Sequence, residues 1–184
     1  MGRSDLHKYL APLEFAHGAL EFAHGGMMPI DKDEFRKAMS RFASSVTVVT
    51  TRSENGEPKG LTVSAFCSLS LDPPLVLICI EKNASLHQFL KEGSHFAVNI
   101  LSEDQELVSR RFASRDTNRF EGIGHRKGAT GTPVLEDVIA HIECIVQQCH
   151  PAGDHTIFVG QVEAAETTDG RPLTYFRGGY SKLS

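Results

Sequence analysis

Short hydrophobic runs rich in β-branched residues recur along the chain, and most of them have the length of a β-strand. The clearest are VTVVTT (46–51), LVLICI (75–80), HFAVNIL (95–101), VIAHIECIVQQC (138–149) and HTIFVGQVEAAE (155–166). β-Branched and aromatic side chains pack well on a pleated surface, so these runs predict strands. LVLICI is apolar at every position, which is typical of a strand buried on both faces.

Turn-forming residues separate these runs at short intervals. The Asn-Gly pair at 55–56 predicts a hairpin, because both turn positions favour positive φ, and residues 60–71 then form the return strand. The sequence DPP at 72–74 ends that strand, since proline has no N–H to donate to a ladder. Residues 150–154 turn the last pair. Few links are long enough for parallel crossovers, so the expected fold class is mainly β: an antiparallel barrel of about six strands with helical insertions.

Three capping-box patterns predict short helices between the strands. Residues 31–34 open a helix with apolar side chains at helical spacing, which should end near Ser44. Residues 85–88 and 102–105 open two more. Residues 113–133 are rich in Gly, Asp, Asn and Arg, and they predict a long loop, a kind of segment that is often functional.

The first 28 residues differ from the rest, because they contain a tandem repeat, LEFAHGA (13–19) followed by LEFAHGG (20–26). Acidic residues interrupt its apolar positions, which argues against a secretory signal. Two copies are also too few for a solenoid. We therefore expect residues 1–28 to form an extension, helical or disordered, outside a single domain that spans residues 29–184.

Composition narrows the class of protein further. A length of 184 residues suits one domain, and 19 basic against 23 acidic side chains give a net charge of −4. That balance argues against nucleic-acid or anionic-membrane binding driven by charge. No apolar run approaches the roughly 20 residues of a membrane span. Four cysteines without CxxC spacing indicate reduced thiols in a cytoplasmic protein, and they argue against a zinc site or a disulfide framework.

The common nucleotide and esterase motifs are absent: no GxGxxG follows a strand, and there is neither a P-loop lysine nor a GxSxG elbow. His141 and Glu143 are two residues apart in a predicted strand, so their side chains share one face. No further metal ligands are evident near them. A polar barrel exterior or a subunit contact is therefore favoured over a metal site.

Three segments could contact a ligand, although each also has a plain structural explanation. The small hydroxyl residues of TVSA (62–65) leave room for a flat ring close to the backbone, yet such residues often face solvent. Asn83 and Ser85, at a helix start, could bind phosphate through free N–H groups and the helix dipole, or could simply cap the helix. His155, at the start of a strand, could hydrogen-bond a ligand in a groove or lie on the surface.

Taken in order, segments from Ile30 to Tyr180 resemble the flavin reductase-like domain family of the FMN-binding split-barrel superfamily. The matching segments are FRKAMSRFASSVTVVTT, GLTVSAFCSLSLDPPLVLICIEKNAS, HFAVNIL, SRRFA, GTPVLEDVIAHIEC, GDHTIFVGQV and PLTYFRGGY. The resemblance implies a six-stranded antiparallel Greek-key barrel that forms homodimers. It also implies that FMN, or FAD in some members, lies in a groove near the dimer interface.

The same resemblance implies which residues contact the cofactor. At the matching positions, the wall beside the isoalloxazine ring is formed by Thr62, Val63, Ser64, Ala65, Cys67, Ser68 and Leu69. Family members often carry a hydroxyl residue where Cys67 stands. Asn83 and Ser85 would hold the ribityl phosphate, and His155 would face the nicotinamide as the catalytic residue. Further expected cofactor contacts are Asn99, Arg111, Phe112 and Tyr180.

The activity that the resemblance implies is that of an NAD(P)H-dependent flavin oxidoreductase. NADH or NADPH passes a hydride to FMN or FAD, and the reduced flavin then reaches a partner flavin-dependent monooxygenase. Two alternatives stay open, namely a ferric reductase on the same fold and a flavin-binding carrier or sensor without turnover. Arg115, Arg119 and Arg126 all lie in the long loop, where an arginine could contact the 2′-phosphate of NADPH.

Overall fold

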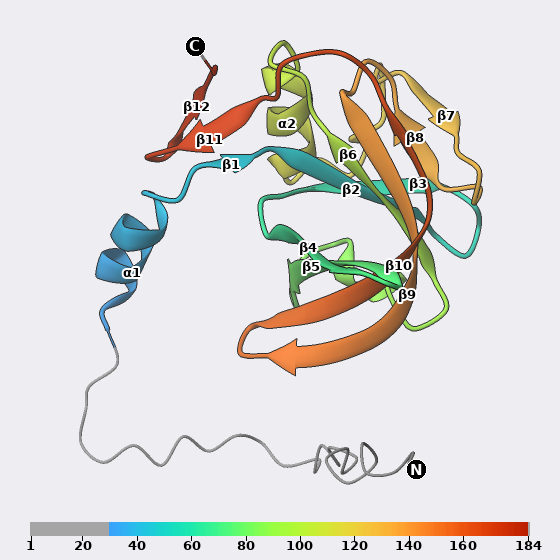
Figure 1. The fold of residues 1–184 in the computed structure, drawn as a ribbon, viewed down its shortest axis with the longest axis horizontal. Helices are drawn as coiled ribbons and strands as arrows, with labels where there is room; N and C mark the ends of the chain where they lie inside the picture. Colours follow the sequence, from blue (N-terminus) through green and yellow to red (C-terminus); the bar gives the residue numbers. More distant parts are fainter. Residues whose placement is uncertain (1–29, 184) are drawn as a thin grey trace, which may run out of the picture.

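The computed structural model describes residues 30–183, which contain a seven-stranded antiparallel sheet curled into a barrel (Figure 1). In the order in which they pair, the strands are β3 (Pro58–Val63), β2 (Thr47–Arg52), β6 (His95–Ile100), β9 (Ala140–Ala152), β10 (His155–Thr167), β5 (Pro74–Glu81) and β4 (Phe66–Leu71). The predicted antiparallel barrel is therefore confirmed. The extension predicted for residues 1–28 lies outside the described residues, as do residues 29 and 184.

The single return strand predicted for residues 60–71 is wrong, because the chain changes partners in its middle. β3 pairs with β2, whereas β4 pairs with β5 at the other end of the sheet. Ser64 and Ala65 alone connect the two strands, and the Cys79 N–H donates to the Ala65 carbonyl (3.0 Å) as the new pairing begins. Neither glycine nor proline marks this corner, so the sequence pattern concealed it, and the sheet has seven strands rather than six.

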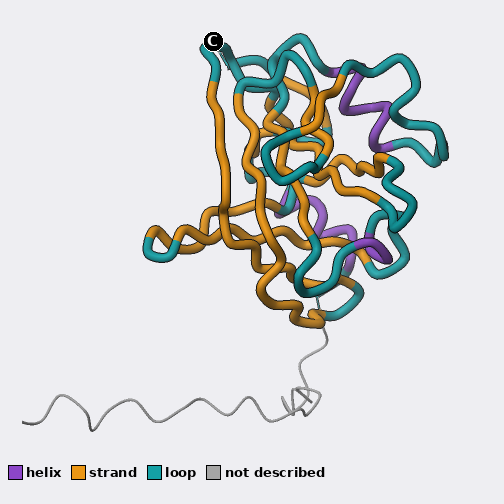
Figure 2. The backbone as a smooth tube through the Cα atoms, turned by 90° about the vertical axis from the view of Figure 1, so that its right-hand side faces the viewer, coloured by secondary structure: helices purple, strands orange, loops and turns teal. Residues whose placement is uncertain are grey.

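The remaining elements lie around the barrel. They are α1 (Lys32–Met39), β1 (Ser44–Ser45), the 3₁₀ turn η1 (His87–Phe89), α2 (Glu106–Ala113), β7 (His125–Lys127), β8 (Pro133–Leu135), β11 (Thr174–Phe176) and β12 (Gly179–Ser181). β1, β11 and β12 form a small separate sheet, and β7 pairs with β8 inside the long predicted loop. Figure 1 shows α1 standing away from the barrel and the long β9–β10 hairpin running down to its lower side, and Figure 2 shows the same strands from the side. No helix among residues 30–183 is long and apolar enough to cross a membrane.

The first predicted helix start is correct, although that helix is shorter than expected. Asp31 caps α1 by accepting from the N–H groups of Asp33 (2.8 Å) and Glu34 (3.4 Å). The helix ends at Met39 instead of near Ser44, and none of its residues is buried. The third predicted helix starts later than its capping pattern: the N-cap of α2 is Gln105 instead of Ser102, and no side chain caps the helix. The Gln105 side chain does accept from the N–H of Ser102 (3.0 Å), before the helix begins.

The core consists of two clusters of buried side chains. The cluster inside the barrel includes Val49, Ile78, Phe96, Val98, Cys144 and Phe158. The second cluster lies beneath α2 and includes Val46, Val48, Leu101, Phe112, Leu135 and Leu173. The second cluster matters for the site described below, because it fixes α2 against β2 and β3.

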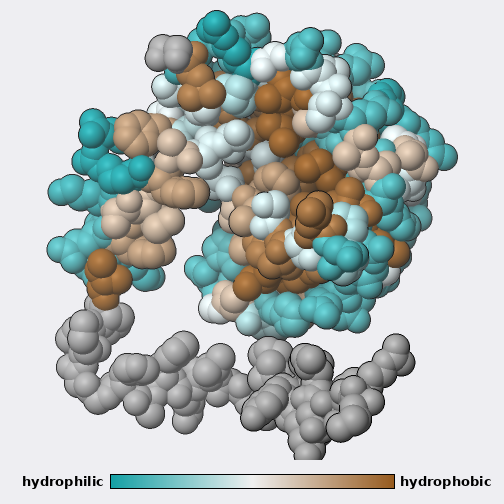
Figure 3. All heavy atoms as spheres, viewed as in Figure 1, coloured by the Kyte–Doolittle hydropathy of each residue, from teal (hydrophilic) through white to brown (hydrophobic). Residues whose placement is uncertain are grey.

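β5 is not buried on both faces, contrary to the prediction from its apolar sequence. Every second side chain points into the barrel core, and the others remain half exposed: Leu75, Leu77 and Cys79. On the neighbouring β4, Leu69 and Leu71 are 48% and 92% exposed. Figure 3 shows hydrophobic side chains gathering on the face of the barrel where β4 and β5 lie. A single chain therefore leaves an apolar sheet face uncovered, which is unusual for a stable monomer.

A buried carboxylate fastens the loop between β7 and β8 to the outside of the barrel. Glu143, on β9, is 1% exposed and accepts hydrogen bonds from the N–H groups of Ala129 and Thr130 (both 2.8 Å) and from the Thr130 hydroxyl. His141 lies on the same face of β9, as predicted, and its Nε2 is 3.8 Å from Oε1 of Glu143. Both side chains are covered by the loop, so they are not part of an exposed barrel exterior. Among residues 30–183, no group of three or more His, Cys, Asp or Glu side chains is placed to hold a metal ion.

These contacts decide the charge state of Glu143. Burial raises the pKa of a carboxyl group, but the hydrogen bonds from residues 129 and 130 and the nearby His141 outweigh it, and the pKa of Glu143 lies below its ordinary value. A carboxyl group with a lowered folded-state pKa stabilises the fold above its unfolded pKa, near pH 4. That stabilisation is lost as the pH falls through the folded-state value.

We predict that Glu143→Gln lowers the free energy of unfolding by about 1–3 kcal/mol at pH 7, because an amide cannot accept from all three donors. The difference from wild type should shrink as the pH falls below about 4, where both side chains are neutral. Urea denaturation between pH 7 and pH 3 measures this difference in the free energy of unfolding. Glu54→Gln, at an exposed position in the β2–β3 turn, is the control. A difference that did not depend on pH would contradict the assignment.

Candidate functional site

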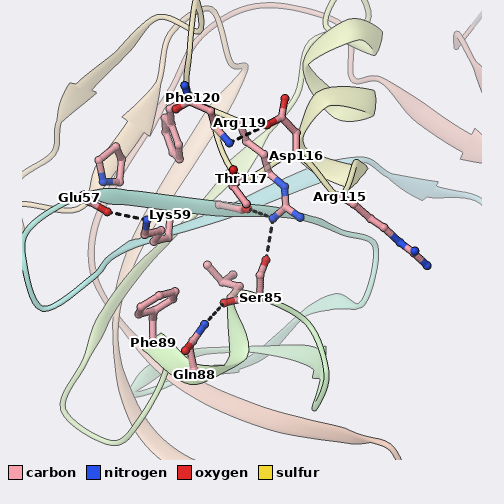
Figure 4. Close-up of a pocket in the computed structure, with 14 residues that line it drawn as sticks. Glu57, Lys59, Ser85, Gln88, Phe89, Arg115, Asp116, Thr117, Arg119 and Phe120 are labelled. Carbon is pink, nitrogen blue, oxygen red and sulfur yellow. Dashed lines mark hydrogen bonds and ion pairs between the residues drawn. The ribbon is translucent and has the colours of Figure 1, made fainter.

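A pocket of about 500 Å³ opens between the start of β3, the turn at η1 and the loop that follows α2 (Figure 4). Residues 57–60, 85, 86, 88, 89 and 115–120 line it. The volume lies within the range of small-molecule sites in proteins. The pocket therefore combines three segments that are distant in sequence, and one of them is the long loop predicted for residues 113–133.

The lining combines cationic and aromatic side chains. Lys59 lies 5.9 Å above the centre of the Phe89 ring and pairs with Glu57 at 2.8 Å. Phe120 supplies a second apolar wall, and Arg119 and Arg115 add two guanidinium groups. In Figure 4 Arg119 points into the pocket and Arg115 extends away from it. An anionic ligand with an apolar part suits such a lining.

The Arg119 guanidinium joins the three segments of the pocket. Its Nη1 donates to the carbonyl of Gly60 (2.8 Å) and to the hydroxyl of Ser85 (3.0 Å). Its Nε and Nη2 donate to the carbonyl of Ser114 at 3.0 and 2.6 Å. Burial lowers the pKa of Arg119 from its ordinary value, and the charge of Asp116 acts in the opposite direction. Arginine nevertheless stays protonated.

The capping box predicted at residues 85–88 is wrong. Only the three-residue turn η1 forms there, its cap position is Leu86, and no side chain caps it. The hydroxyl of Ser85 is bonded to Arg119 instead, while Gln88 Nε2 donates to the Ser85 carbonyl at 3.1 Å. Positive charge near Ser85 thus comes from a guanidinium and not from a helix dipole. Asn83 is exposed in the same turn and does not line the pocket.

Gly60 permits the close approach of α2 that shapes this wall. A Cβ atom at position 60 would lie 2.5 Å from the ring of Phe112 and 3.3 Å from that of Phe120. Phe112 is fully buried and packs edge-to-face on Phe120 at 4.9 Å. Phe112, predicted as a cofactor contact, therefore supports the pocket from behind without lining it.

The TVSA segment runs from the edge of this pocket to the barrel corner. Thr62 donates to the carbonyl of Ser109 in α2 (2.7 Å), and Val63 is buried in the barrel core. Ser64 and Ala65 are exposed at the corner. Ser64 also lines a second pocket of about 250 Å³, together with Phe42, Ala43, Ser44, Ser45, Thr47, Phe66 and Ile100. Residues 60 and 64 are about 13 Å apart along an extended chain, so the two pockets lie near opposite ends of one short segment.

Several other predicted contacts lie at the surface near this segment. Cys67, Ser68 and Leu69 are exposed on β4, the strand that follows the corner. Tyr180 reaches α2 from β12, where its hydroxyl lies 2.9 Å from that of Ser109 and the Arg110 guanidinium lies 4.8 Å above its ring. Thr62 and Tyr180 therefore both contact Ser109, one through its carbonyl and the other through its hydroxyl.

Asn99 and Arg111 serve the framework of the protein and line neither pocket. Asn99 is fully buried, donates to the carbonyl of Val48 (2.9 Å) and accepts from the N–H of Leu135 (2.9 Å), so it attaches β8 to the barrel. Arg111 donates to the carbonyl of Asn118 at 3.0 Å and thereby holds the loop that lines the larger pocket. The structure thus explains both residues without a ligand.

His155 is the first residue of β10. It lines neither pocket, but the residue that follows it contacts η1. It is paired with Glu81 of β5, and the next residue, Thr156, shares a hydrogen bond with His87 of η1 (2.9 Å). The ring Nδ1 of His155 lies 2.7 Å from the carboxylate of Asp154. That hydrogen bond and the charge of a protonated His155 lower the pKa of Asp154. His155 is half exposed and free to contact a ligand through Nε2.

The sequence singled out neither Lys59 nor the two phenylalanines of the larger pocket. Lys59 follows a hairpin turn, and Phe89 and Phe120 belong to a predicted helix and a predicted loop, so no shared periodicity linked them. The composition of residues 113–133, with several arginines in a long loop, and the candidate phosphate-binding residue Ser85 pointed toward this region.

Comparison with known proteins identifies the family to which this chain belongs. The sequence signature of the flavin reductase like domain matches residues 39–184. The FMN reductase (NADH) SmoA of Agrobacterium fabrum is 42% identical over 150 residues, which is 82% of this chain and 85% of that protein. The reductase subunit HsaB of a flavin-dependent monooxygenase from Rhodococcus jostii is 37% identical, covering 84% of this chain and 79% of its own length. The chain spans only 48% of the length of another curated relative, a probable flavin reductase of Rhizobium meliloti.

A solved structure shows the same fold. The NADH:FAD oxidoreductase SgcE6 of Streptomyces globisporus C-1027, in complex with NAD and FAD fragments, superposes with a TM-score of 0.79 at 35% identity. The match covers 84% of this chain and 93% of that one. The barrel, its corner and the matched residues together place this chain in the flavin reductase-like domain family of split-barrel proteins.

Proposed function

We propose that this chain is an NAD(P)H-dependent flavin oxidoreductase that reduces FMN or FAD and supplies the reduced flavin to a flavin-dependent monooxygenase. The observation that carries the proposal is family membership over residues 39–184, with 42% identity to a relative named as an FMN reductase (NADH). The relative named as a monooxygenase reductase subunit supports the monooxygenase partner. Neither relative is named as a ferric reductase or a flavin carrier, so these alternatives are not favoured.

The two pockets fit the two ends of a flavin. The larger pocket has three cationic side chains and two aromatic walls, which suit a phosphate and the chain attached to it. The smaller pocket, at Ser64, is mostly apolar and adjoins exposed backbone at the barrel corner, which suits a flat ring. The segment of residues 60–65 joins the two pockets, so the predicted TVSA contacts lie along the path of the ligand.

The chain itself contributes binding and orientation. Backbone groups at Ser64 and Ala65 orient the ring edge, and Arg119 and Lys59 hold the phosphate end. Bound flavin supplies the hydride acceptor, so no protein acid or base is required for the transfer from NAD(P)H. We propose that His155 donates a hydrogen bond to the nicotinamide carboxamide, with its ring oriented by the Asp154 carboxylate, which lies 2.7 Å from Nδ1. The four cysteines are all free, which supports a location in the cytoplasm.

A homodimer explains the uncovered apolar surfaces, and a second copy of this chain is the occupant that we propose for them. The sheet face at β4 and β5 is apolar and exposed, while α1, which has no buried residue, presents Phe35 (54% exposed) and Met39 (51%), and Phe42 (72%) follows the helix. Phe42 also lines the smaller pocket. A partner that covers these surfaces would therefore cover the ring end of the flavin groove as well.

We predict a mass of about 40 kDa in solution for the wild type, which is twice the 20.2 kDa of one chain. The double variant Phe35→Ser, Met39→Ser should shift toward the monomer mass, because it removes apolar area that only a partner can bury. Light scattering after size exclusion measures both. Lys37→Ser, on the same helix, is the control. Since α1 has no buried residue within one chain, the substitutions should leave the barrel of the monomer folded, and a monomeric wild type would refute the proposal.

An anaerobic titration of the protein plus FMN with NADH, followed at 450 nm, tests the activity. We expect the flavin absorbance to bleach much faster than in a control without protein. Bleaching with neither NADH nor NADPH, despite measurable flavin binding, would favour the carrier or sensor. Reduction of a ferric chelate that needs no added flavin would favour the ferric reductase.

We predict that His155→Ala raises KM for the nicotinamide by about tenfold, the effect of losing one hydrogen bond, and leaves KM for flavin within about twofold. Steady-state kinetics with each substrate varied in turn measures the split. His150→Ala is the matched control, since His150 lies in the same hairpin and bonds only to Gln148 at 3.0 Å. Unchanged kinetics would remove His155 from the site.

A further inference from the structure

His87 is the one residue of η1 that does not line the larger pocket, whereas Gln88 and Phe89 do (Figure 4). Its ring lies against β10 instead. Nε2 of His87 is 2.9 Å from Oγ1 of Thr156, and the ring packs edge-to-face on that of Phe158, with the ring centres 5.5 Å apart. Thr156 and Phe158 are 7% and 1% exposed. The side chain of His87 therefore joins the turn to the buried face of β10.

These contacts determine the direction in which His155 points. Successive side chains of a strand lie on opposite faces, so a Thr156 side chain held toward the barrel core places that of His155 on the outer face. The pairing of His155 with Glu81 is the last of the β5–β10 ladder before the hairpin turn. The end of a ladder opens more easily than its middle. The hydrogen bond from His87 holds β10 one residue away from this end.

A second set of hydrogen bonds holds the hairpin on the other side of His155. The N–H of Lys82 donates to the carbonyl of Asp154 (2.9 Å), and the Lys82 ammonium donates to the carbonyl of Gly153 (2.6 Å). Together with the bond from η1, these bonds attach one short segment to the hairpin on both sides of position 155. The turn beside the larger pocket and the strand that carries His155 thus form one connected unit.

We propose that His87 is a positioning residue for the nicotinamide: it holds the side chain of Thr156 inward and thereby keeps His155 directed at the hydride donor. The inference rests on the proposed function for the contact between His155 and the nicotinamide. Leu86 and Leu90 are buried and attach the turn to the core independently of this bond. Loss of the bond between His87 and Thr156 should therefore leave the turn, and the pocket beside it, in place.

Steady-state kinetics with the nicotinamide nucleotide and FMN varied in turn tests the proposal. His87→Leu should raise KM for the nicotinamide by about threefold, which is less than the tenfold expected for His155→Ala, because His87 acts only through His155. KM for FMN and kcat at saturation should stay within about twofold. His87→Gln provides an amide that can donate to the Thr156 hydroxyl or accept from it, and it should restore KM for the nicotinamide.

Substitutions at Thr156 test the same hydrogen bond from its other end. Thr156→Val removes the hydroxyl from a side chain of nearly the same shape and should match His87→Leu, and it serves if that variant does not fold. Thr156→Ser keeps the hydroxyl and should behave as wild type. Thr167→Val, at the exposed far end of β10, is the matched control. Amide hydrogen exchange at residues 154–156 should be faster in His87→Leu and Thr156→Val than in the control.

A double-mutant cycle shows whether His87 acts through His155. In the His155→Ala background, His87→Leu should not raise KM for the nicotinamide any further. Additive effects would overturn the proposal, and so would equal increases in KM for the nicotinamide and for FMN. Unchanged kinetics of His87→Leu, or of His155→Ala itself, would also overturn it. A wild type that bleaches flavin with neither NADH nor NADPH would instead refute the proposed reductase activity, so the two failures are distinguishable.

Discussion

The closure of the barrel depends on a two-residue connection. Ser64 and Ala65 carry the chain from one end of a seven-stranded sheet to the other, so the sheet must curl until its ends meet. At the corner the carbonyls of Ser64 and Ala65 accept from the N–H groups of Phe66 (3.1 Å) and Cys79 (3.0 Å), whereas their own N–H groups have no main-chain acceptor among the described residues. The same corner that closes the fold therefore also provides polar backbone beside an apolar pocket. Binding at the corner follows from the topology and needs few special side chains.

Elements with strong local signals agreed between sequence and structure. The strands at 46–51, 95–101, 138–149 and 155–166 appear within a few residues of their predicted bounds, because their β-branched runs leave little choice of conformation. The corner at residues 64–65 was hidden, since a change of strand partner is a long-range event without a local residue signature. The failed capping box at Ser85 has a similar cause: the hydroxyl that could have capped a helix is bonded to Arg119, which is distant in sequence.

The candidate site likewise combines residues that the sequence could name with contacts that only the fold creates. Thr62 and Tyr180 could be named from the resemblance, and the structure brings both into contact with Ser109 of α2. Asn99 and Arg111 were named with them, but their hydrogen bonds explain them as framework residues. The cationic pocket combines a hairpin, a 3₁₀ turn and a loop, which only the folded chain brings together. β5 illustrates the reverse case, because its uniformly apolar sequence describes an assembly better than a single chain.

The way in which Arg119 is held has a consequence for how this protein can vary. Three of its four hydrogen bonds go to main-chain carbonyls, which every amino acid possesses. Position 114 can therefore accept other side chains without releasing the guanidinium, whereas position 60 is restricted to glycine by the ring of Phe112. Substitutions are thus tolerated at position 114 of the loop but not at position 60 in the wall of the pocket. A loop built in this way can diversify its outer surface, and with it the proteins it meets, while the charge inside the pocket stays in place.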